Sequence, residues 1–409
     1  MRYYLGIDWA DEDDAVWVAN EAGEKVVSRR IAHTVAARSE WARWLRERQA
    51  EGIELWAAIE RPHGRIVDFL LAHGVVVYAI NPKSLDRARD RYRVGRSKSD
   101  PFDAQVLALF LRSDHGQLRP LRPSSEAAQE LQGLTRDYRR QVHLQTRLVN
   151  QLTATLKEYY PRALELSEDL TAQWVQAFLA HYPTPAAVAA LTQPAWQAFA
   201  RAHRLAPARI AALWQTLQQP QLPLPAHVVR TKARLLQALL RELAPTLATV
   251  AEYRAAIDDF FAAMPTSEIA RSLPVGKAGT TVPTIWAELG DHAERWDSVR
   301  RLQGYAGSVP ETERSGSGGH RLIKFRFACN PVLRDALHQL AFLSLSHSLW
   351  AHTYYARYRA RNHTHHEALR ALGAKWLKII FVMWKRHVPY SEDHHLATMA
   401  RQQLRQPAA

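Results

Sequence analysis

Residues 81–112 read NPKSLDRARDRYRVGRSKSDPFDAQVLALFLR, so a basic run stands directly before a pair of carboxylates. Between Lys83 and Lys98 there are seven Lys or Arg residues and two Asp residues, and such a segment attracts a polyanion. An apolar periodic run then begins at Asp100, with proline at the first helical position, which predicts a helix start. Asp100 and Asp103 lie three residues apart and project from the first turn, where the helix dipole favours anions. Either these acids only begin a helix, or they join further acids around a cation.

The composition is that of a folded protein with a large anionic partner. The chain has 409 residues, 47% of them hydrophobic and 23% charged, which predicts two or three cores. Its net charge is +14, and nucleic acid fits this charge better than a membrane because no stretch approaches the roughly 18 apolar residues of a membrane span. The N-terminus lacks a signal-peptide core, and the single cysteine, Cys329, excludes a disulfide framework and a cysteine-based zinc site. We therefore expect a protein of the reducing cytoplasm.

The N-terminal part has the pattern of an α/β sheet. Strands are expected at residues 3–8, 15–20, 25–31, 53–59 and 75–80, and helices at 34–49, at 66–72 and from 100 onwards. The order βββαβαβα is that of an RNase H-like sheet. Asp8 ends the first strand and Glu60 the fourth, and neighbouring parallel strands bring residues at their ends together.

Four acids, Asp8, Glu60, Asp100 and Asp103, are thus expected at one edge of this sheet. Two like charges about 4 Å apart cost roughly 4 kcal/mol at an effective dielectric near 20, so the cluster needs a cation. Hard oxygen ligands select Mg²⁺ or Mn²⁺, and such ions stabilise the attacking and leaving oxygens of phosphoryl transfer. A metal-dependent phosphodiester site follows, unless Asp8 and Glu60 merely end strands.

The middle of the chain is helical. Residues 125–160 carry loose heptads and predict a long helix that serves as a dimerisation or spanning arm, followed by short helices over 162–218. After the breaker QPQLPLP at 219–225, a second long helix is expected over 226–263, bent near Pro245. A plain bundle core is the alternative for both long helices.

The C-terminal part holds a candidate nucleophile. Gly276 and Gly279 form a short turn that weakly suggests backbone contacts to a DNA phosphate. Residues 309–326 form a glycine-rich loop with Ser315 and Ser317 among four basic residues, Arg314, Arg321, Lys324 and Arg326. A serine on a flexible cationic loop can attack a phosphodiester, although a solvated glycine turn would look the same.

Two apolar helices are expected at 330–349 and 365–384, and the tail from Met399 should be frayed. The segment 354–386 has eight Lys or Arg residues against one Glu, interleaved with aromatics, which suits a nucleic-acid groove. His363, His365 and His366 resemble a metal cluster, but no cysteine or acid completes it.

Several motifs together resemble the DEDD transposases of the insertion sequence 110 family. They are GID at 6–8, IERPHG at 59–64, NPK at 81–83 and KSDPFDA at 98–104, and residues 302–315 with the stretch through 330 are similar to that family's C-terminal transposase domain. The resemblance implies an α/β plus all-α protein. It would have a RuvC-like domain at 1–118, a helical coiled-coil linker with a small helical insertion at 119–265, a small helical transposase domain with a serine loop at 266–395, and a tail at 396–409. The family's P-G-x-G turn is replaced by Pro274–Gly279, PVGKAG.

The resemblance also implies the site and its partners. The metal ligands would be Asp8, Glu60, Asp100 and Asp103, holding Mg²⁺ or Mn²⁺. The nucleophile would be Ser315, and Ser317, in the second Ser-Gly of the same loop, is the alternative. Strand exchange between donor and target DNA would pass through a phosphoserine and would be guided by an element-encoded bridge RNA. The protein would be bacterial and nucleoid-associated. It would act as a dimer or tetramer in which each active site takes its serine and its acids from different protomers. Nucleic acid would contact Lys83, Arg87, Arg89, Arg91, Arg93, Arg96, Lys98, Arg314, Arg321, Lys324 and Arg326.

Three other functions compete with this interpretation. The closest is a metal-dependent nuclease such as a junction resolvase, in which the serine loop is inert. A sugar-kinase or actin-like ATPase shares the strand order, but Trp9 follows Asp8 where that class needs a small residue. A non-catalytic nucleic-acid-binding regulator is the third.

Overall fold

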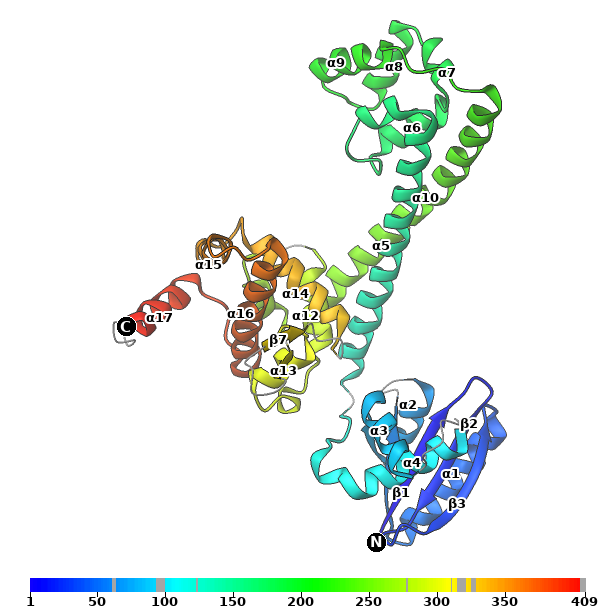
Figure 1. Cartoon of the computed structure of the whole chain (residues 1–409), viewed down its shortest axis with the longest axis vertical. Coiled ribbons are helices and arrows are strands. Elements are labelled where there is room, and N and C mark those ends of the chain that lie inside the picture. The colour runs from blue at the N-terminus through cyan, green and yellow to red at the C-terminus, as the bar shows by residue number, and fades with distance from the viewer. Residues whose placement is uncertain are drawn as a thin grey trace. The chain divides into compact units, whose positions relative to one another are not determined.

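The computed structural model describes residues 1–60, 64–92, 100–122, 124–276, 279–309, 311–314, 321–324 and 329–404. The chain divides into two compact units, Met1–Pro123 and Ser124–Ala409. The first is built on a sheet and the second is mainly helical (Figure 1).

The sheet of the first unit has five strands in the order β3-β2-β1-β4-β5. Its strands are β1 (Arg2–Trp9), β2 (Asp13–Ala19), β3 (Lys25–Ala32), β4 (Glu54–Ile59) and β5 (Val76–Ala79). The first three form an antiparallel meander, whereas β4 pairs in parallel with both β1 and β5. The centre of the sheet is therefore β1, which has one antiparallel and one parallel neighbour.

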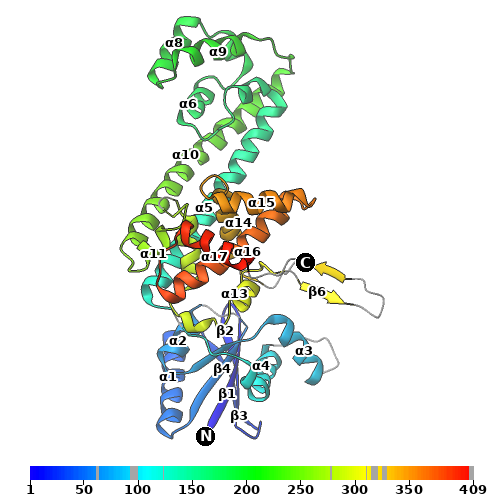
Figure 2. The ribbon, with the colours of Figure 1, turned by 90° about the vertical axis from the view of Figure 1, so that its left-hand side faces the viewer.

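Helices cover both faces of the sheet (Figure 2). The helices are α1 (Val35–Ala50), α2 (Arg65–Ala72), α3 (Pro82–Tyr92) and α4 (Asp100–Asp114), with a 3₁₀ turn η1 (His115–Gln117). Leu5 and Ile7 of β1 share a core with Trp41 of α1 and Leu70 of α2. Each such fully buried side chain contributes roughly 1.5–3 kcal/mol. Because side chains alternate along a strand, Gly6 and Asp8 turn to the opposite face, which α4 covers.

Gly6 lets α4 come close to the central strand. A Cβ on Gly6 would collide with the carbonyl oxygen of Ala104 and would lie 2.6 Å from the amide nitrogen of Ala108. No residue with a side chain fits there without moving the helix. Gly6 therefore determines how near the first turn of α4, with its two acids, lies to the end of β1.

Two long helices form the stem of the second unit and lie side by side (Figure 1). They are α5 (Glu126–Tyr159) and α10 (Ala226–Ala262), and α10 continues through Pro245. The C-terminal half of α5 and the N-terminal half of α10 share a core with a group of small helices. These are η2 (Pro161–Glu165), α6 (Gln173–His181), α7 (Pro185–Ala189), α8 (Gln193–Ala202) and α9 (Pro207–Gln218).

The other ends of the two long helices pack on a second helical core, which contains Trp376 and Leu340. The elements here are α11 (Ser267–Arg271), α12 (Thr281–Leu289), η3 (Ala293–Arg295), α13 (Val299–Tyr305), α14 (Pro331–Ser344), α15 (Leu349–Ala360), α16 (His365–Arg386) and α17 (Glu392–Leu404). Between α13 and α14, β6 (Glu311–Arg314) and β7 (Arg321–Lys324) form an antiparallel hairpin.

The predicted strands and helices of the first unit occur in the predicted order, with α3 added between β5 and α4, and both long helices are confirmed. Three expectations were wrong. Residues 311–314 and 321–324 were predicted as loop, but they form two paired strands in which the β-forming residues Thr312 and Ile323 are partners. Helix α3 was not predicted, because its charged residues obscure the short apolar side made by Leu85 and Ala88. The tail does not fray at Met399, since α17 continues to Leu404.

Candidate active site

Two of the four predicted acids lie at one edge of the sheet. In the parallel pairing of β1 with β4, Ile7 is the partner of Ile59. The next residues along the two strands are Asp8 and Glu60, so both acids stand where these strands end. Asp100 and Asp103 occupy the first turn of α4, the helix that packs on β1.

The charges of the other three acids act on Asp8. The pKa of Asp8 is raised from its ordinary 3.8 to about 6, first by burial and then by the negative charges of Asp103, Asp100 and Glu60. The nearby guanidinium of Arg89 opposes this rise. Asp8 is therefore the centre of a negatively charged cluster, as expected for acids that converge from separate parts of the chain.

Arginines neutralise part of this charge. Arg89 of α3 grips the buried Asp103 with two bonds, 2.7 Å from Nε to Oδ1 and 2.9 Å from Nη2 to Oδ2. Arg30 of β3 reaches Asp100 at 3.1 Å and also bonds Asp13. With the carboxylates so engaged, no group of three Asp, Glu, His or Cys side chains among the described residues is placed to hold a metal ion.

The donor chemistry nevertheless fits a divalent cation. All four groups are carboxylates, the hard oxygen donors that Mg²⁺ and Mn²⁺ prefer. After burial, the negative charges of Asp103, Asp100 and Glu60 raise the pKa of Asp8, and Arg89 opposes them. A cation at this edge would relieve that repulsion and would compete with Arg89 for Asp103.

The basic residues predicted to contact nucleic acid fall into three groups. Arg87 and Arg91 lie exposed on α3, with Lys83 on the same helix, whereas Arg89 turns its guanidinium to Asp103 and Asp86. Arg314 of β6 and Arg321 of β7 are partners across the hairpin, and Lys324 ends β7. Arg93, Arg96, Lys98 and Arg326 lie outside the described residues.

A basic groove on the face of the sheet that α1 and α2 cover was missed from the sequence. It has a volume of about 910 Å³ and is lined by residues that include Trp9, His33, Arg38, Arg46, Arg65 and His73. Trp9 directly follows Asp8, and Ile59, also in the lining, directly precedes Glu60. Arg38 and Arg46 are eight residues apart on α1, and this spacing puts both on one side of a helix. That spacing was the signal in the sequence that could have indicated the groove.

Arg38 is held in this groove by a buried acid. Asp14 of β2 is fully buried and pairs with Arg38, while His33 Nε2 lies 3.4 Å from its other oxygen. Breaking a buried pair of this kind by removing one partner costs about 3–5 kcal/mol, so the position of Arg38 is strongly constrained.

Ser315 and Ser317 lie outside the described residues, but both ends of their hairpin are anchored. A Cβ on Gly307, whose φ is +63°, would lie 2.7 Å from Cys329 Sγ, so the segments before β6 and after β7 touch. The next residue, Asn330, donates a 2.6 Å bond to Glu288. Glu288 is buried and accepts two further bonds, of 2.8 and 2.9 Å, from Arg136.

The three clustered histidines turn to different partners. His363 lies 3.8 Å from Glu367, the ring of His365 meets the hydroxyl of Tyr355 at 2.7 Å, and His366 meets His338 at 3.3 Å. They do not converge on a common point, and nothing further supports a metal there.

Comparison with known proteins places this arrangement in a class. Residues 5–161 match a DEDD transposase model of the IS110 type, described as a transposase, and residues 268–356 match the model described as "Transposase IS116/IS110/IS902 family". The first match contains all four acids and the second contains Ser315. No described helix is long and apolar enough to cross a membrane.

Individual proteins are also similar to this chain. The chain is similar to the mini-circle putative transposase for IS117 of Streptomyces coelicolor, with 34% identity covering 92% of each chain. It is also 37% identical to putative transposase y4uE of Sinorhizobium fredii, over 39% of this chain and 45% of the relative. The insertion element IS900 uncharacterized 42 kDa protein of Mycobacterium paratuberculosis is 27% identical over 95% of this chain and 96% of its own.

The matches define a transposase, an enzyme class that cuts and recombines DNA. Within that class, the chain belongs to the IS110 family of insertion-sequence transposases.

Proposed function

We propose that this transposase cuts and exchanges strands of donor and target DNA through the acids of its first unit and Ser315 of its second. The observation that carries the proposal is the convergence of negative charge on Asp8, which lies on the central strand. The strand order β3-β2-β1-β4-β5, with the parallel pairs on one side, supports an RNase H-like, specifically RuvC-like, domain at residues 1–118.

The rest of the chain would follow the organisation implied by the resemblance. Residues 119–265 would be a coiled-coil linker with a helical insertion, supported by the packing of α5 along α10. Residues 266–395 would be the transposase domain and 396–409 a tail. We also propose a homo-oligomer, a dimer or a tetramer, in which acids and serine come from different protomers.

Asp8, Glu60, Asp100 and Asp103 would hold Mg²⁺ or Mn²⁺. The bound ion supplies positive charge that polarises the scissile phosphate and stabilises the charge that develops on its oxygens. Asp8 must be ionised to take part, so its raised pKa makes the site more competent as the pH rises through about 6.

Ser315 would act as the nucleophile. Its Oγ forms a bond to phosphorus while the bond to the 3′ oxygen breaks; the serine loses its proton, and the leaving oxygen takes one up to become a 3′-hydroxyl. A 3′-hydroxyl of the partner strand then attacks the phosphoserine, which releases Ser315 and completes the exchange. Arg314 and Arg321, cross-strand partners in the hairpin on either side of the serine loop, would stabilise the developing charge.

The positive surface supports the nucleic-acid partners. The net charge of +14, the exposed Arg87 and Arg91 on α3, and the basic groove that includes Trp9 provide phosphate contacts and an aromatic face for an unstacked base. We propose that DNA passes along this groove and that an element-encoded guide RNA uses further parts of the basic surface.

The test uses purified chain and labelled DNA that carries the element's ends. Wild-type protein with Mg²⁺ should cut the DNA and leave a protein–DNA adduct that survives denaturation. Ser315→Ala should abolish both, Ser317→Ala should not, and Asp103→Asn should abolish cutting without abolishing DNA binding. Cutting by Ser315→Ala would replace the serine chemistry with that of a plain metal-dependent nuclease, and recombination by Asp103→Asn would overturn the role of the acids.

A further inference from the structure

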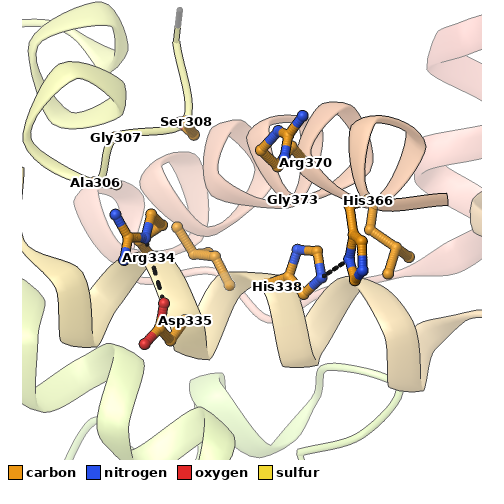
Figure 3. A pocket seen from close by; sticks show the side chains of 11 residues that line it. Ala306, Gly307, Ser308, Arg334, Asp335, His338, His366, Arg370 and Gly373 are labelled. Atoms are coloured by element: carbon orange, nitrogen blue, oxygen red, sulfur yellow. Dashed lines mark hydrogen bonds and ion pairs between the residues drawn. The ribbon is translucent and has the colours of Figure 1, made fainter. Parts of the chain in front are cut away.

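A pocket of about 240 Å³ lies between α14 and α16 at the end of α13. Figure 3 shows that Arg334, Asp335 and His338 come from α14, and His366 and Arg370 from α16. Leu337 and Leu369 complete the apolar part of the lining. Gly373 keeps the helices close, because a Cβ there would lie 3.2 Å from the carbonyl oxygen of Leu337.

The pocket has an excess of positive charge. Arg370 makes no hydrogen bond or ion pair with any residue in the described ranges, and Arg334 lines the same space. The one acid, Asp335, is already shared, since it pairs with Arg139 of α5 and with Arg334 at 3.3 Å. Among the described lining residues, two arginines and two histidines therefore face one carboxylate, which is already engaged; Glu367 of α16, outside the lining, is close enough to feel the charge of Arg370.

The histidines respond to this excess. His338 Nε2 and His366 Nδ1 lie 3.3 Å apart, a contact in which one ring donates and the other accepts (Figure 3). Burial lowers the pKa of His338, as do the nearby His366, Arg370 and His365, and only Asp335 opposes them. An anion in the pocket would reverse this effect and favour protonation of the pair.

The pocket lies at the base of the serine hairpin. Its lining includes Ala306, Gly307 and Ser308, the residues that lead from α13 towards β6. Gly307 touches Cys329, on the far side of the hairpin, and Arg334 Nη1 lies 3.7 Å from Cys329 Sγ. A ligand held here would be bound where both ends of the hairpin join the helical domain.

An apolar hollow adjoins the pocket. Its volume is about 320 Å³, and it shares His338 and Leu369 with the pocket. Phe342 and Leu343 line it and are 55% and 40% exposed, so the hollow offers an apolar surface to solvent. A free phosphate would not use such a surface, whereas a nucleotide presents a phosphate with a flat base beside it.

We infer that this pocket binds a backbone phosphate of a DNA strand and that the adjoining hollow takes the neighbouring base against Phe342. Arg370 and the histidine pair, which takes up one proton so that one ring still donates to the other, hold the phosphate oxygens by charge-assisted hydrogen bonds. The inference rests on the proposed function only in bringing DNA to this domain, and it does not depend on attack by Ser315. The ligand is DNA rather than RNA because the proposed function brings DNA to this domain, and the RNA of the same sequence in the test below checks that choice.

The test measures binding of the full chain, without divalent metal, to a fluorescent single-stranded DNA, to its duplex and to RNA of the same sequence. Arg370→Gln should weaken single-stranded DNA binding about tenfold and lower the slope of log affinity against log salt by about one. Phe342→Ala should weaken single-stranded binding more than duplex binding, because only an unpaired base can reach the hollow.

The pH dependence provides a second measurement. Wild-type affinity should rise several-fold from about pH 8 to about pH 6, because the phosphate favours the protonated histidines, and His338→Gln should remove much of that rise. His181→Gln and Arg201→Gln, exposed residues of α6 and α8, are the matched controls and should bind as wild type. Arg370→Lys, which keeps the charge, should retain most of the affinity and separates a lost contact from a misfolded chain.

Affinity and salt slope unchanged in Arg370→Gln would overturn the inference. So would a loss confined to RNA, or equal losses in Arg370→Gln and Arg201→Gln. Ser315→Ala should bind DNA as wild type does; if that variant still cuts DNA, the serine chemistry fails while the phosphate pocket stands.

Discussion

Replacing Asp8 with Asn should stabilise the metal-free protein at neutral pH. The pKa of Asp8 rises from 3.8 to about 6, and one pH unit corresponds to about 1.4 kcal/mol, so a fully buried group would be strained by about 3 kcal/mol. Because Asp8 is partly exposed, solvent screening reduces this to about 1–2 kcal/mol. Asn keeps the shape and removes the charge, so the midpoint of thermal unfolding of the first unit should rise by roughly 3–8 °C.

The pH dependence distinguishes this effect from a packing effect. A raised carboxyl pKa means that the folded state binds the proton more tightly, so wild-type stability falls as the pH rises from about 3.8 to about 6 and stays low above it. The advantage of Asp8→Asn should therefore be complete near pH 7 and absent below about pH 4. Differential scanning calorimetry in metal-free buffer measures it, with Asp68→Asn, on the exposed side of α2, as the control that gains nothing. A variant that is less stable than wild type at pH 7, or equally favoured at all pH values, would refute the convergence of charge on Asp8.

Three further substitutions probe the parts of the site. Arg89→Ala leaves the buried Asp103 without its two hydrogen bonds and should lower the free energy of unfolding by about 3–5 kcal/mol in metal-free calorimetry. The same variant should bind Mn²⁺ more tightly in titration calorimetry. Unchanged stability would contradict the pairing of Arg89 with Asp103. Gly6→Ala must push α4 away from β1, so it should abolish DNA cutting even where circular dichroism shows a folded chain. Full activity of this variant would show that the close approach of α4 to β1 is not needed. Glu288→Gln weakens the buried network with Arg136 and Asn330 and should lower the unfolding midpoint and slow adduct formation in a cleavage assay, whereas wild-type rates would show that the hairpin does not depend on it.

The sequence predicted the structure best where a single hydrophobic periodicity dominated. Alternation in β1 and β4 predicted both strands, and the rule that neighbouring parallel strands end at one edge of a sheet was enough to place Asp8 beside Glu60. The proline-capped start of α4 predicted the positions of Asp100 and Asp103 equally well. Each of these predictions depends only on local pattern and on sheet geometry.

Side-chain partners could not be predicted in this way. Arg89 was one of many basic residues in its segment, and nothing local indicates that it, rather than Arg87, reaches Asp103. That choice depends on how the short apolar side of α3 packs. The burial of Asp14 was hidden for a similar reason, because it stands last in a run of four acids and only the pairing of β2 with β1 turns it inwards.

Features made by several helices were also beyond the sequence. The groove beside Trp9 needs α1 and α2 to pack on one face of the sheet, and the pocket beside Arg370 needs α14 and α16 to cross at Gly373. In both places the lining residues look like an ordinary solvated helix surface when read along the chain.

The central claim is that acids distant in the chain form one cation site. Electron paramagnetic resonance of Mn²⁺ titrated into the full chain near pH 7.5 tests it most directly, with Asp8→Asn, Asp103→Asn and the control Asp68→Asn measured alongside. The account predicts that the wild type and the control bind the ion and that each of the other two variants loses most of that binding. Equal binding by all four proteins would contradict it.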